Sequence, residues 1–278
     1  MNISVGAGRL HWDFPALCAA MSSPFADTEV DRYRAPALDK GLDILELLSE
    51  QAQGLTRAEI VKAMGRSPSE IYRMLERLVA RDYVTRSTEG DRYALSLKLF
   101  VLAHRHPPVN RLVAQAQPVI EAFATAVEQS GHLGLYDRGN ITVVAQVDSP
   151  DKLGFALRLG ARVSLVDTAS GHVLLAFQSA ERRAEMLAAH EALEGEIPLA
   201  EAELQARLAR VRADGGWVGA SLQTEGVTDL SMPVLGPDGH AVAVLTCPFI
   251  RRIDRHPGPD IGATRVLLAA AASALSIS

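Results

Sequence analysis

Two helix-start motifs follow each other closely and restrict the local fold more than any other feature of the chain. Thr56 is followed three residues later by Glu59, and Ser67 is followed in the same way by Glu70. This spacing is typical of a capping box, in which each of the two side chains bonds the other residue's backbone N–H at a helix start. Pro68 occupies the first helical position, where a missing N–H costs nothing. The sequence therefore predicts two helices with a tight turn between them.

The neighbouring segments complete the order of a known DNA-binding motif. Leu38, Leu42, Leu45 and Leu48 recur at helical spacing and predict an earlier helix that ends before Gly54. Residues 83–86 and 92–95 have strand character on either side of a turn at 88–91. The predicted order is helix, helix, tight turn, helix and hairpin. This order is typical of a winged helix-turn-helix, whose second motif helix lies in the DNA major groove.

The net charge of -5 at first argues against a nucleic-acid partner, but its distribution does not. Residues 1–31 contain one Arg against four acids, and residues 99–278 contain fifteen Lys and Arg against nineteen acids. Residues 32–98 contain twelve basic residues against ten acids. The one basic stretch therefore coincides with the predicted winged helix, and its small surplus favours a few placed arginines over bulk attraction to phosphate.

The face of the third helix that turns away from its apolar side supplies the candidate DNA contacts. Arg73 and Tyr72 can reach base edges or phosphates, and the serines at the helix start can hold phosphate. The arginines outside this helix are candidates for backbone contacts. The predicted DNA-binding residues are Arg66, Ser67, Ser69, Tyr72, Arg73, Arg77, Arg86 and Arg92. The alternative is a charged helix of a small bundle, in which Glu70 and Glu76 pair with Arg73 or Arg77.

The remainder of the chain alternates strand and helix patterns, which is the signature of an α+β domain. The predicted strands are LGLYD, ITVVAQV, GFALRL and AVAVLTC, and the predicted helices lie near 169–178, 180–190, 200–213 and 261–275. Helical patterns at 97–104 and 109–130 flank Pro107-Pro108 and predict a linker. Residues 1–34 lack a sustained period and predict a poorly ordered arm. Its Trp12, Phe14 and Leu17 dock on a neighbour, or the reading frame is over-extended before Met21.

Four segments carry a resemblance to a known family. They read LTRAEIVKAMGRSPSEIYRMLERLVARDYV, RYALSLKL, DTASGHVLLA and GWVGASLQTEGVTDLSMPVLGPDGHAVAVLT. From about Ala37 to its C-terminus the chain resembles the IclR family of bacterial transcriptional regulators. The resemblance implies an N-terminal winged helix-turn-helix, a linker helix and a GAF/PAS-like antiparallel-sheet effector domain. It also implies homodimers or homotetramers on a palindromic operator. The expected divisions are 1–34 (arm), 35–96 (DNA-binding domain), 97–109 (linker helix) and 110–278 (effector-binding and oligomerisation domain).

Small residues before a helix at 166–172 predict an anion site, because backbone N–H groups and the positive end of the helix dipole face the ligand. A carboxylate effector fits this chemistry, and the resemblance points to small organic or aromatic acids. The expected effector-binding residues of this segment are Thr168, Ala169, Ser170, Gly171 and His172. The resemblance implies four more, Asp229, Ser231, Thr246 and Cys247, on strands that face the helix. Leu133, Leu135, Leu153 and Phe155 are candidates for an apolar wall, or for plain core. Two alternatives remain open: Thr168 or Ser170 as a simple helix cap, and His172 as a solvent-facing residue.

Three departures from the family pattern leave the effector unidentified: His172 instead of lysine, the run 220–224 instead of paired acids, and Asp229 instead of a small residue. Asp229 also disfavours a purely anionic ligand unless it accepts a ligand hydroxyl or amine.

The sequence does not favour an enzyme, a metal-binding protein or a membrane protein. No nucleophile elbow, metalloprotease motif or phosphate-binding loop is present, so no enzymatic activity and no cofactor are expected. Cys18 and Cys247 stand alone, and no histidine pair has metal-ligand spacing, so no metal is expected. No apolar run spans a membrane and no secretory signal is evident, which predicts a cytoplasmic protein. The expected function is a ligand-responsive regulator of a catabolic or metabolic operon that binds double-stranded operator DNA. A small-molecule sensor without DNA binding is the alternative. The sequence does not decide between repressor and activator.

Overall fold

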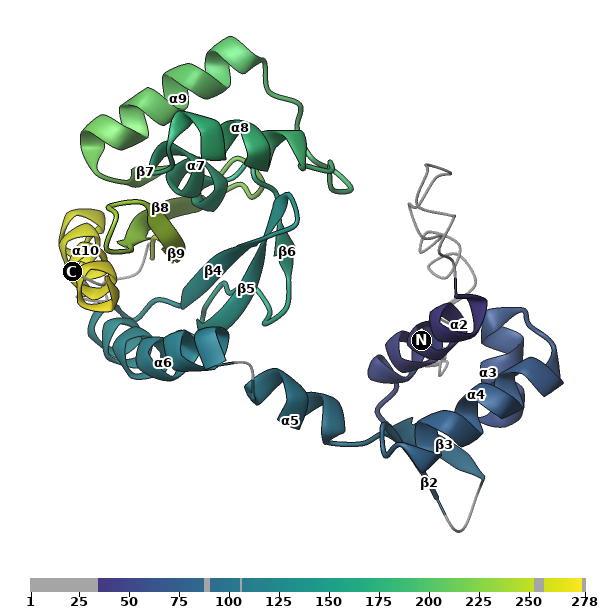
Figure 1. The fold of residues 1–278 in the computed structure, drawn as a ribbon. Helices are drawn as coiled ribbons and strands as arrows, with labels where there is room; N and C mark the ends of the chain where they lie inside the picture. Colours follow the sequence, from purple (N-terminus) through teal and green to yellow (C-terminus); the bar gives the residue numbers. More distant parts are fainter. Residues whose placement is uncertain (1–34, 88–90, 106, 253–257, 277–278) are drawn as a thin grey trace, which may run out of the picture. The chain divides into compact units, whose positions relative to one another are not determined.

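The computed structural model describes residues 35–87, 91–105, 107–252 and 258–276, so the predicted arm at 1–34 lies outside the described residues. The chain divides into two compact units, Met1–Val101 and Leu102–Ser278. Among the described residues, the first unit contains the helices α2, α3 and α4 and a small sheet, and the second contains a six-stranded antiparallel sheet between two layers of helices (Figure 1). The predicted α+β class is confirmed.

The first unit has the predicted order of elements. Its helices are α2 (Pro36–Ser49), α3 (Arg57–Met64) and α4 (Pro68–Ala80), and its sheet, in the order β1-β3-β2, contains β1 (Leu55–Thr56), β2 (Val84–Arg86) and β3 (Arg92–Leu95). The strand β1 is an addition to the predicted hairpin, since Leu55 and Thr56 pair with Tyr93 and Arg92. The hairpin of β2 and β3, which we call the wing, is therefore attached through β1 to the start of α3.

Both predicted helix starts are present. The Thr56 backbone N–H donates to Glu59 Oε2 at 2.7 Å, and the Glu59 N–H donates to Thr56 Oγ1 at 3.3 Å. At the next helix, the Ser67 hydroxyl donates to Glu70 Oε2 at 2.7 Å. Between them Gly65 ends α3 with φ of 59°, a conformation that glycine adopts without steric cost. These local contacts fix where α4 begins.

One apolar cluster holds the three helices and the wing together. Its buried members are Ile44, Leu48, Ile60, Ile71, Leu75, Val84 and Tyr93. Burying a side chain of this size contributes about 1.5–3 kcal/mol, before conformational entropy is subtracted. Because Ile71 and Leu75 are fully buried, the opposite side of α4 is directed to solvent.

The linker begins with α5 (Lys98–His104), and α6 (Pro107–Val127) follows it. The proline pair does not interrupt a helix, because it forms the first turn of α6, where no N–H is needed. Large apolar side chains of this segment are exposed, among them Leu97 at 78% and Phe100 at 60%.

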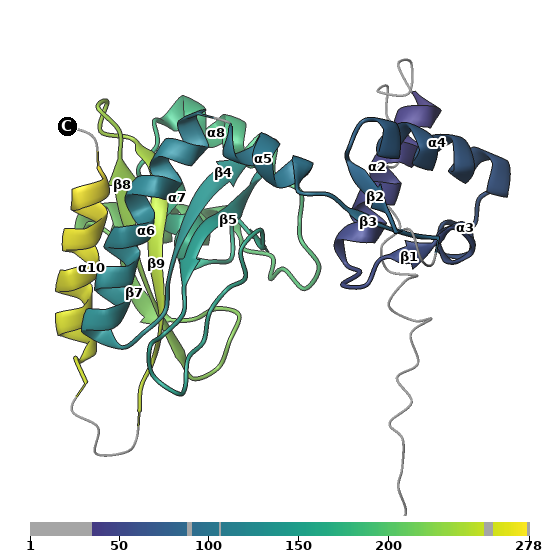
Figure 2. The same cartoon turned by 90° about the horizontal axis from the view of Figure 1, so that it is seen from below.

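The second unit is built on one sheet with the strand order β6-β5-β4-β9-β8-β7. Its strands are β4 (Gly131–Asp137), β5 (Asn140–Val147), β6 (Arg162–Val163), β7 (Trp217–Ala220), β8 (Val227–Leu235) and β9 (Ala241–Ile250). Its other helices are α7 (Ala169–Ala176), α8 (Ala180–Ala188), α9 (Glu201–Asp214) and α10 (Ile261–Leu275). One core lies between the sheet and α6 with α10, and a second lies between the sheet and α7, α8 and α9 (Figure 2).

One predicted strand is wrong. Residues 154–159, the segment GFALRL, form no strand, and the short β6 follows them. Gly160 adopts a φ of 80°, and Ala161 N donates to Arg158 O at 3.0 Å, so the chain turns at this point. The apolar residues of this segment therefore belong to a loop and not to a strand. This loop lies beside the pocket described below.

Candidate functional site

The exposed side of α4 carries most of the predicted DNA contacts. Arg66, Ser67, Ser69, Tyr72, Arg73 and Arg77 are all exposed. They lie away from the buried residues Ile71 and Leu75, as the helical period requires. The helix thus presents hydroxyl groups at its N-terminus and guanidinium groups along one face.

The acidic residue at the start of α4, Glu70, bonds residues other than the arginines of this helix. Glu70 accepts a hydrogen bond from Lys40 Nζ of α2 at 2.5 Å and bonds Ser67 as well. The hydrogen bond from Lys40, followed by those with Ser67, lowers the pKa of Glu70 to about 2. Glu70 therefore pairs with neither Arg73 nor Arg77. Within the described residues no ion pair joins Arg66, Arg73 or Arg77 to a carboxylate, so their charge remains available to a ligand.

The wing arginines are in a different situation. Arg86 forms an ion pair with Asp91, and its guanidinium group lies 5.6 Å from the centre of the Tyr93 ring. Arg92 donates to the Gly54 carbonyl at 3.0 Å and lies 3.7 Å from Glu59. Both residues are exposed and both stabilise the wing, which reduces the charge that they offer to phosphate.

Arg57 is a candidate that the sequence analysis missed. Its guanidinium group lies 5.5 Å from the centre of the Tyr72 ring, which joins the first residue of α3 to the exposed face of α4. Both side chains are exposed. The pairing places a further positive charge beside Tyr72, and no local pattern in the sequence could have indicated it.

A pocket lies in the second unit where α7 begins above β4, β8 and β9. It is a cavity of about 50 Å³. Its lining comes from seven separate stretches of the chain and comprises His132, Phe155, Leu157, Val163, Asp167, Thr168, Ala169, Ser170, Ser221, Leu222, Gln223, Thr224, Asp229, Thr246 and Pro248. No Lys or Arg side chain is among these residues. A negatively charged ligand would therefore depend on backbone N–H groups and on hydroxyl groups.

Polar side chains form a row across the floor of the pocket. His132 of β4 is in register with Thr246 of β9, which is in register with Ser231 of β8. Residues in register on antiparallel strands point to the same face of the sheet. Thr246 Oγ1 lies 2.8 Å from Ser231 Oγ and 2.9 Å from Ser170 Oγ of α7. Three hydroxyl groups thus connect the first turn of α7 to two strands.

The first turn of α7 forms the roof. Thr168 caps the helix, since its Oγ1 accepts from Gly171 N at 3.1 Å, and the same residue lines the pocket. The N–H groups of Ala169 and Ser170 come before the first intrahelical bond, which His172 N makes to Thr168 O. These two groups lie at the positive end of the helix dipole, and both residues line the pocket.

Asp229 faces the same cavity from β8. Burial raises the pKa of Asp229, although a hydrogen bond with Ser221 opposes this shift. The raised pKa favours the neutral carboxyl form relative to an exposed aspartate, which lessens the repulsion that a nearby ligand carboxylate would feel.

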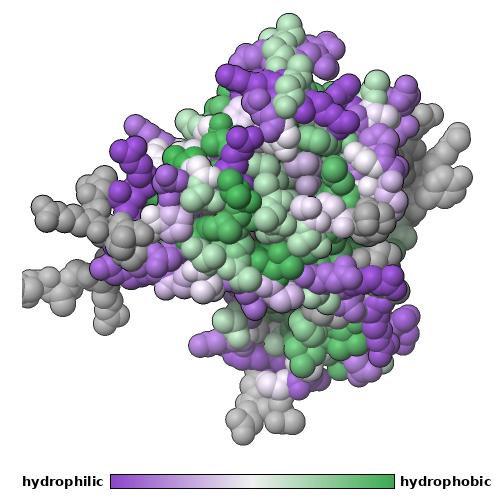
Figure 3. Space-filling model, turned by 90° about the vertical axis from the view of Figure 1, so that its left-hand side faces the viewer, coloured by the Kyte–Doolittle hydropathy of each residue, from purple (hydrophilic) through white to green (hydrophobic). Residues whose placement is uncertain are grey.

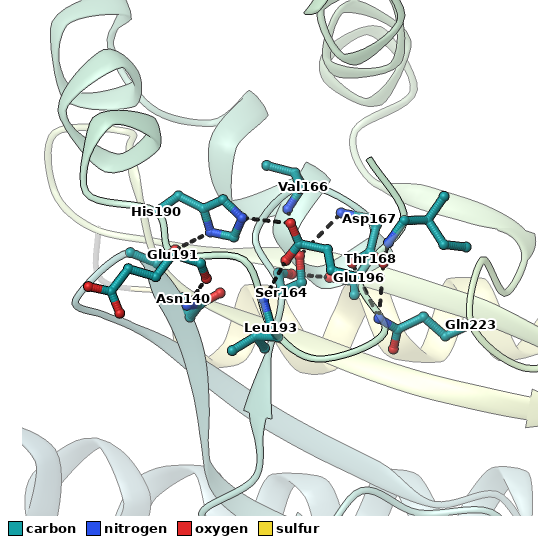
Figure 4. Close-up of polar contacts among 12 residues, drawn as sticks. Asn140, Ser164, Val166, Asp167, Thr168, His190, Glu191, Leu193, Glu196 and Gln223 are labelled. Carbon is teal, nitrogen blue, oxygen red and sulfur yellow. Dashed lines mark hydrogen bonds and ion pairs between the residues drawn. The ribbon is translucent and has the colours of Figure 1, made fainter. Parts of the chain in front are cut away.

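Asp167 joins two loops at the edge of the pocket. It accepts from Ile197 N at 2.9 Å and from Gln223 Nε2 at 3.2 and 3.3 Å (Figure 4). The loop that contains Ile197 is itself held by His190, whose ring nitrogens lie 2.8 Å from Gly139 O and 2.9 Å from Glu196 Oε1. Asp167 was not among the predicted site residues. It positions the segment 221–224 that closes one side of the cavity.

Replacing Asp167 with alanine should loosen both loops. A hydrogen bond to a charged group contributes about 1.5–3 kcal/mol, so we expect amide hydrogen exchange at 221–226 and near Ile197 to accelerate about tenfold or more. The control Gln223→Ala removes only one arm and should accelerate exchange at 221–226 while leaving Ile197 protected. Unchanged exchange at both loops in the Asp167 variant would show that other contacts hold them.

Four predicted effector residues, Gly171, His172, Ser231 and Cys247, lie outside the cavity lining. Cys247 is buried on the opposite face of the sheet, in the core with α6 and α10, because neighbouring residues of a strand alternate and Thr246 faces α7. Its placement in the effector site was wrong. Ser231 lies behind Thr246 and reaches the cavity only through it. A Cβ atom on Gly171 would stand 2.1 Å from the Leu165 carbonyl oxygen, so this glycine permits close packing of α7 on the preceding loop.

His172 is neither solvent-facing nor in the lining. It is fully buried, its Nε2 lies 2.7 Å from Val166 O, and its ring lies 5.2 Å from that of Trp217. Of the predicted apolar wall only Phe155 lines the cavity. Leu133 and Leu135 pack in the core with α6 and α10, and Leu153 is exposed.

Two further observations concern the described part of the chain. No group of three or more His, Cys, Asp or Glu residues there could hold a metal ion. No helix among the described residues is long and apolar enough to cross a membrane.

Comparisons with known proteins give one consistent result. Residues 37–88 match the family described as the IclR helix-turn-helix domain, and residues 108–277 match the bacterial transcriptional regulator IclR, C-terminal. The HTH-type transcriptional regulator KdgR of Escherichia coli (strain K12) is 30% identical over 228 residues, which cover 81% of this chain and 86% of KdgR.

Solved structures show the same fold. An IclR transcriptional regulator from Alicyclobacillus acidocaldarius is 21% identical with a TM-score of 0.68, covering 88% of this chain and 98% of that one. An IclR homologue from Microbacterium hydrocarbonoxydans, crystallised with 4-hydroxybenzoate, is 20% identical with a TM-score of 0.69, covering 86% and 97%.

Proposed function

The chain belongs to the IclR family of bacterial transcriptional regulators. We propose that its first unit binds operator DNA and that its second unit binds an effector that controls this binding. The side chains of α4 contact operator DNA. A small carboxylic acid binds in the pocket beneath α7 and changes the affinity for the operator. The observation that carries the proposal is the exposed face of α4, where three arginines without a carboxylate partner among the described residues accompany a capped N-terminus.

On DNA, we assign base contacts to Tyr72, Arg73 and Arg77, because they project from the middle of the exposed face. Arg66, Ser67 and Ser69 bind phosphate at the helix start. Arg86 and Arg92 contribute weaker phosphate contacts, since each is already held by an acidic neighbour. Arg57 supports Tyr72 from α3.

For the effector, the N–H groups of Ala169 and Ser170 bind the carboxylate, and Phe155, Asp229 and Thr246 surround the rest of the molecule. The 4-hydroxybenzoate bound to the Microbacterium protein supports an acid as the class of ligand. A cavity of about 50 Å³ favours an acid of a few carbons over an aromatic one, since a single water already needs roughly 10–15 Å³.

The regulator acts in the cytoplasm, as a dimer or tetramer and not as an enzyme. Hydrophobic side chains gather on the face shown in Figure 3. Val266 and Leu267 of α10 are also exposed. Exposed apolar residues of α5 add a second surface suited to self-association. Two copies on a palindromic operator would double the contacts of α4.

The proposal can be tested with the full chain. Duplexes selected from a random library give its operator, and a mobility-shift titration at fixed salt then measures affinity with and without short-chain acids. We expect nanomolar to submicromolar binding that changes tenfold or more with one of the acids. Acid binding without any selected DNA would instead identify a sensor that does not bind DNA.

A further inference from the structure

One side chain that lines the pocket has a buried polar atom without a hydrogen-bond partner in the described part of the protein. The His132 side chain is 3% exposed, and its Nε2 atom has no hydrogen-bond partner among the described residues. A buried ring nitrogen without a partner is costly, and such groups in folded proteins usually have an identifiable role. His132 is also one of the residues that line the cavity, so its unpartnered nitrogen belongs to a side chain that borders the ligand site.

The position of His132 relative to the carboxylate site follows from the sheet. His132 is in register with Thr246, and the Thr246 hydroxyl contacts Ser170 in the first turn of α7. His132 and the first turn of α7 therefore border the same cavity from different sides, with Thr246 between them. A ligand in this cavity can meet an imidazole and backbone N–H groups, which are two different kinds of protein group.

The chemistry of His132 differs from that of a cationic anchor. Burial lowers the pKa of His132 to about 4, so the ring is neutral near pH 7. A neutral imidazole nitrogen donates one hydrogen bond in one tautomer and accepts one in the other. Such a group binds a hydroxyl or a carbonyl oxygen, and it gives no charge to a carboxylate.

We infer that His132 determines the specificity of this pocket by bonding a second oxygen on a short-chain carboxylic acid, a hydroxyl or an oxo group, through Nε2. The inference rests on the proposed function, because the same acid places its carboxylate at the first turn of α7. An acid without the second oxygen leaves Nε2 unpaired and binds more weakly.

Three acids of equal chain length provide the test. Propionate, lactate and pyruvate differ only in carrying hydrogen, hydroxyl or oxo at the second carbon, and calorimetric titration of the full chain compares their affinities. We expect lactate or pyruvate to bind at least tenfold more tightly than propionate. Which of the two binds more tightly tells whether Nε2 bonds a hydroxyl or a carbonyl.

Variants assign the preference to His132. His132→Phe keeps the ring and removes both nitrogens, so it should bind all three acids with the affinity of propionate. His132→Gln restores a hydrogen-bonding group and should recover part of the preference, which also covers the case in which the Phe variant does not fold. The control His240→Phe makes the same change at a histidine outside the lining, whose ring bonds Asp238, and should keep the wild-type preference.

The possible failures are distinguishable. If the wild-type protein binds all three acids equally, or if His132→Phe keeps the preference, the role of His132 is wrong and the acid pocket remains. If no acid binds while operator DNA still does, the acid pocket is wrong, and the role of His132 falls with it.

Discussion

Operator affinity should fall by about 1–3 kcal/mol, roughly 5- to 150-fold, when Arg73 is replaced by alanine. The residue is exposed at the middle of α4 and has no carboxylate partner among the described residues, because Glu70 is bound to Lys40. A guanidinium group in this position can form two parallel hydrogen bonds with guanine. Mobility-shift titration at one salt concentration measures the loss, and titration against single-base operator variants shows whether base preference relaxes.

Two controls separate recognition from general charge. Arg73→Lys keeps the charge and loses the forked geometry, so it should retain binding to phosphate with less discrimination between bases. Arg162→Ala removes the same charge from the exposed edge strand of the second unit and should leave operator affinity unchanged. If Arg73→Ala behaves like Arg162→Ala, α4 is not the recognition helix.

The second large effect is expected at Gly171, where alanine should destabilise the second unit by roughly 1–3 kcal/mol or more and abolish acid binding. The added Cβ atom would stand 2.1 Å from the Leu165 carbonyl oxygen, a backbone atom that cannot rotate away. The first turn of α7 must then move from the loop before it. That movement displaces the N–H groups of Ala169 and Ser170 that we assign to the carboxylate.

Chemical denaturation and calorimetry measure the two parts of this prediction. Gly41→Ala is the matched control, because a Cβ atom on Gly41 would meet no atom of the described residues within 4 Å, apart from the neighbouring backbone of α2 itself. Removing a helical glycine there should stabilise the protein by about 0.5–1 kcal/mol. Normal stability and normal acid binding in Gly171→Ala would show that the loop at Leu165 yields freely and that α7 does not hold the carboxylate.

Elements determined by neighbouring residues were predictable from the sequence. The two capping boxes needed only residues three positions apart, and they located α3 and α4. The last helix depends on a long apolar repeat, and its predicted bounds, 261–275, agree with α10. The roles assigned to individual DNA and effector residues remain predictions, since they depend on ligands.

The pocket was harder to predict because its lining comes from segments far apart in the chain. His132, Asp167 and Gln223 meet only after β4, β8 and β9 pair, and no local spacing joins them. Cys247 was misplaced because it stands next to Thr246, whereas alternation along a strand separates neighbours. The apolar composition of the loop at 154–159 resembles that of a strand because Phe155 and Leu157 line a cavity.

The hydroxyl groups of Ser170, Thr246 and Ser231 have a consequence for how a ligand is sensed. Each hydroxyl has one hydrogen, so a row of three can point its hydrogens in either of two directions. A ligand oxygen that accepts from Ser170 makes Thr246 donate to Ser170, and Ser231 then donates to Thr246. A ligand that donates to Ser170 permits the reverse order. The row therefore converts the donor or acceptor character of a ligand at α7 into a hydrogen orientation at β8, without movement of any heavy atom.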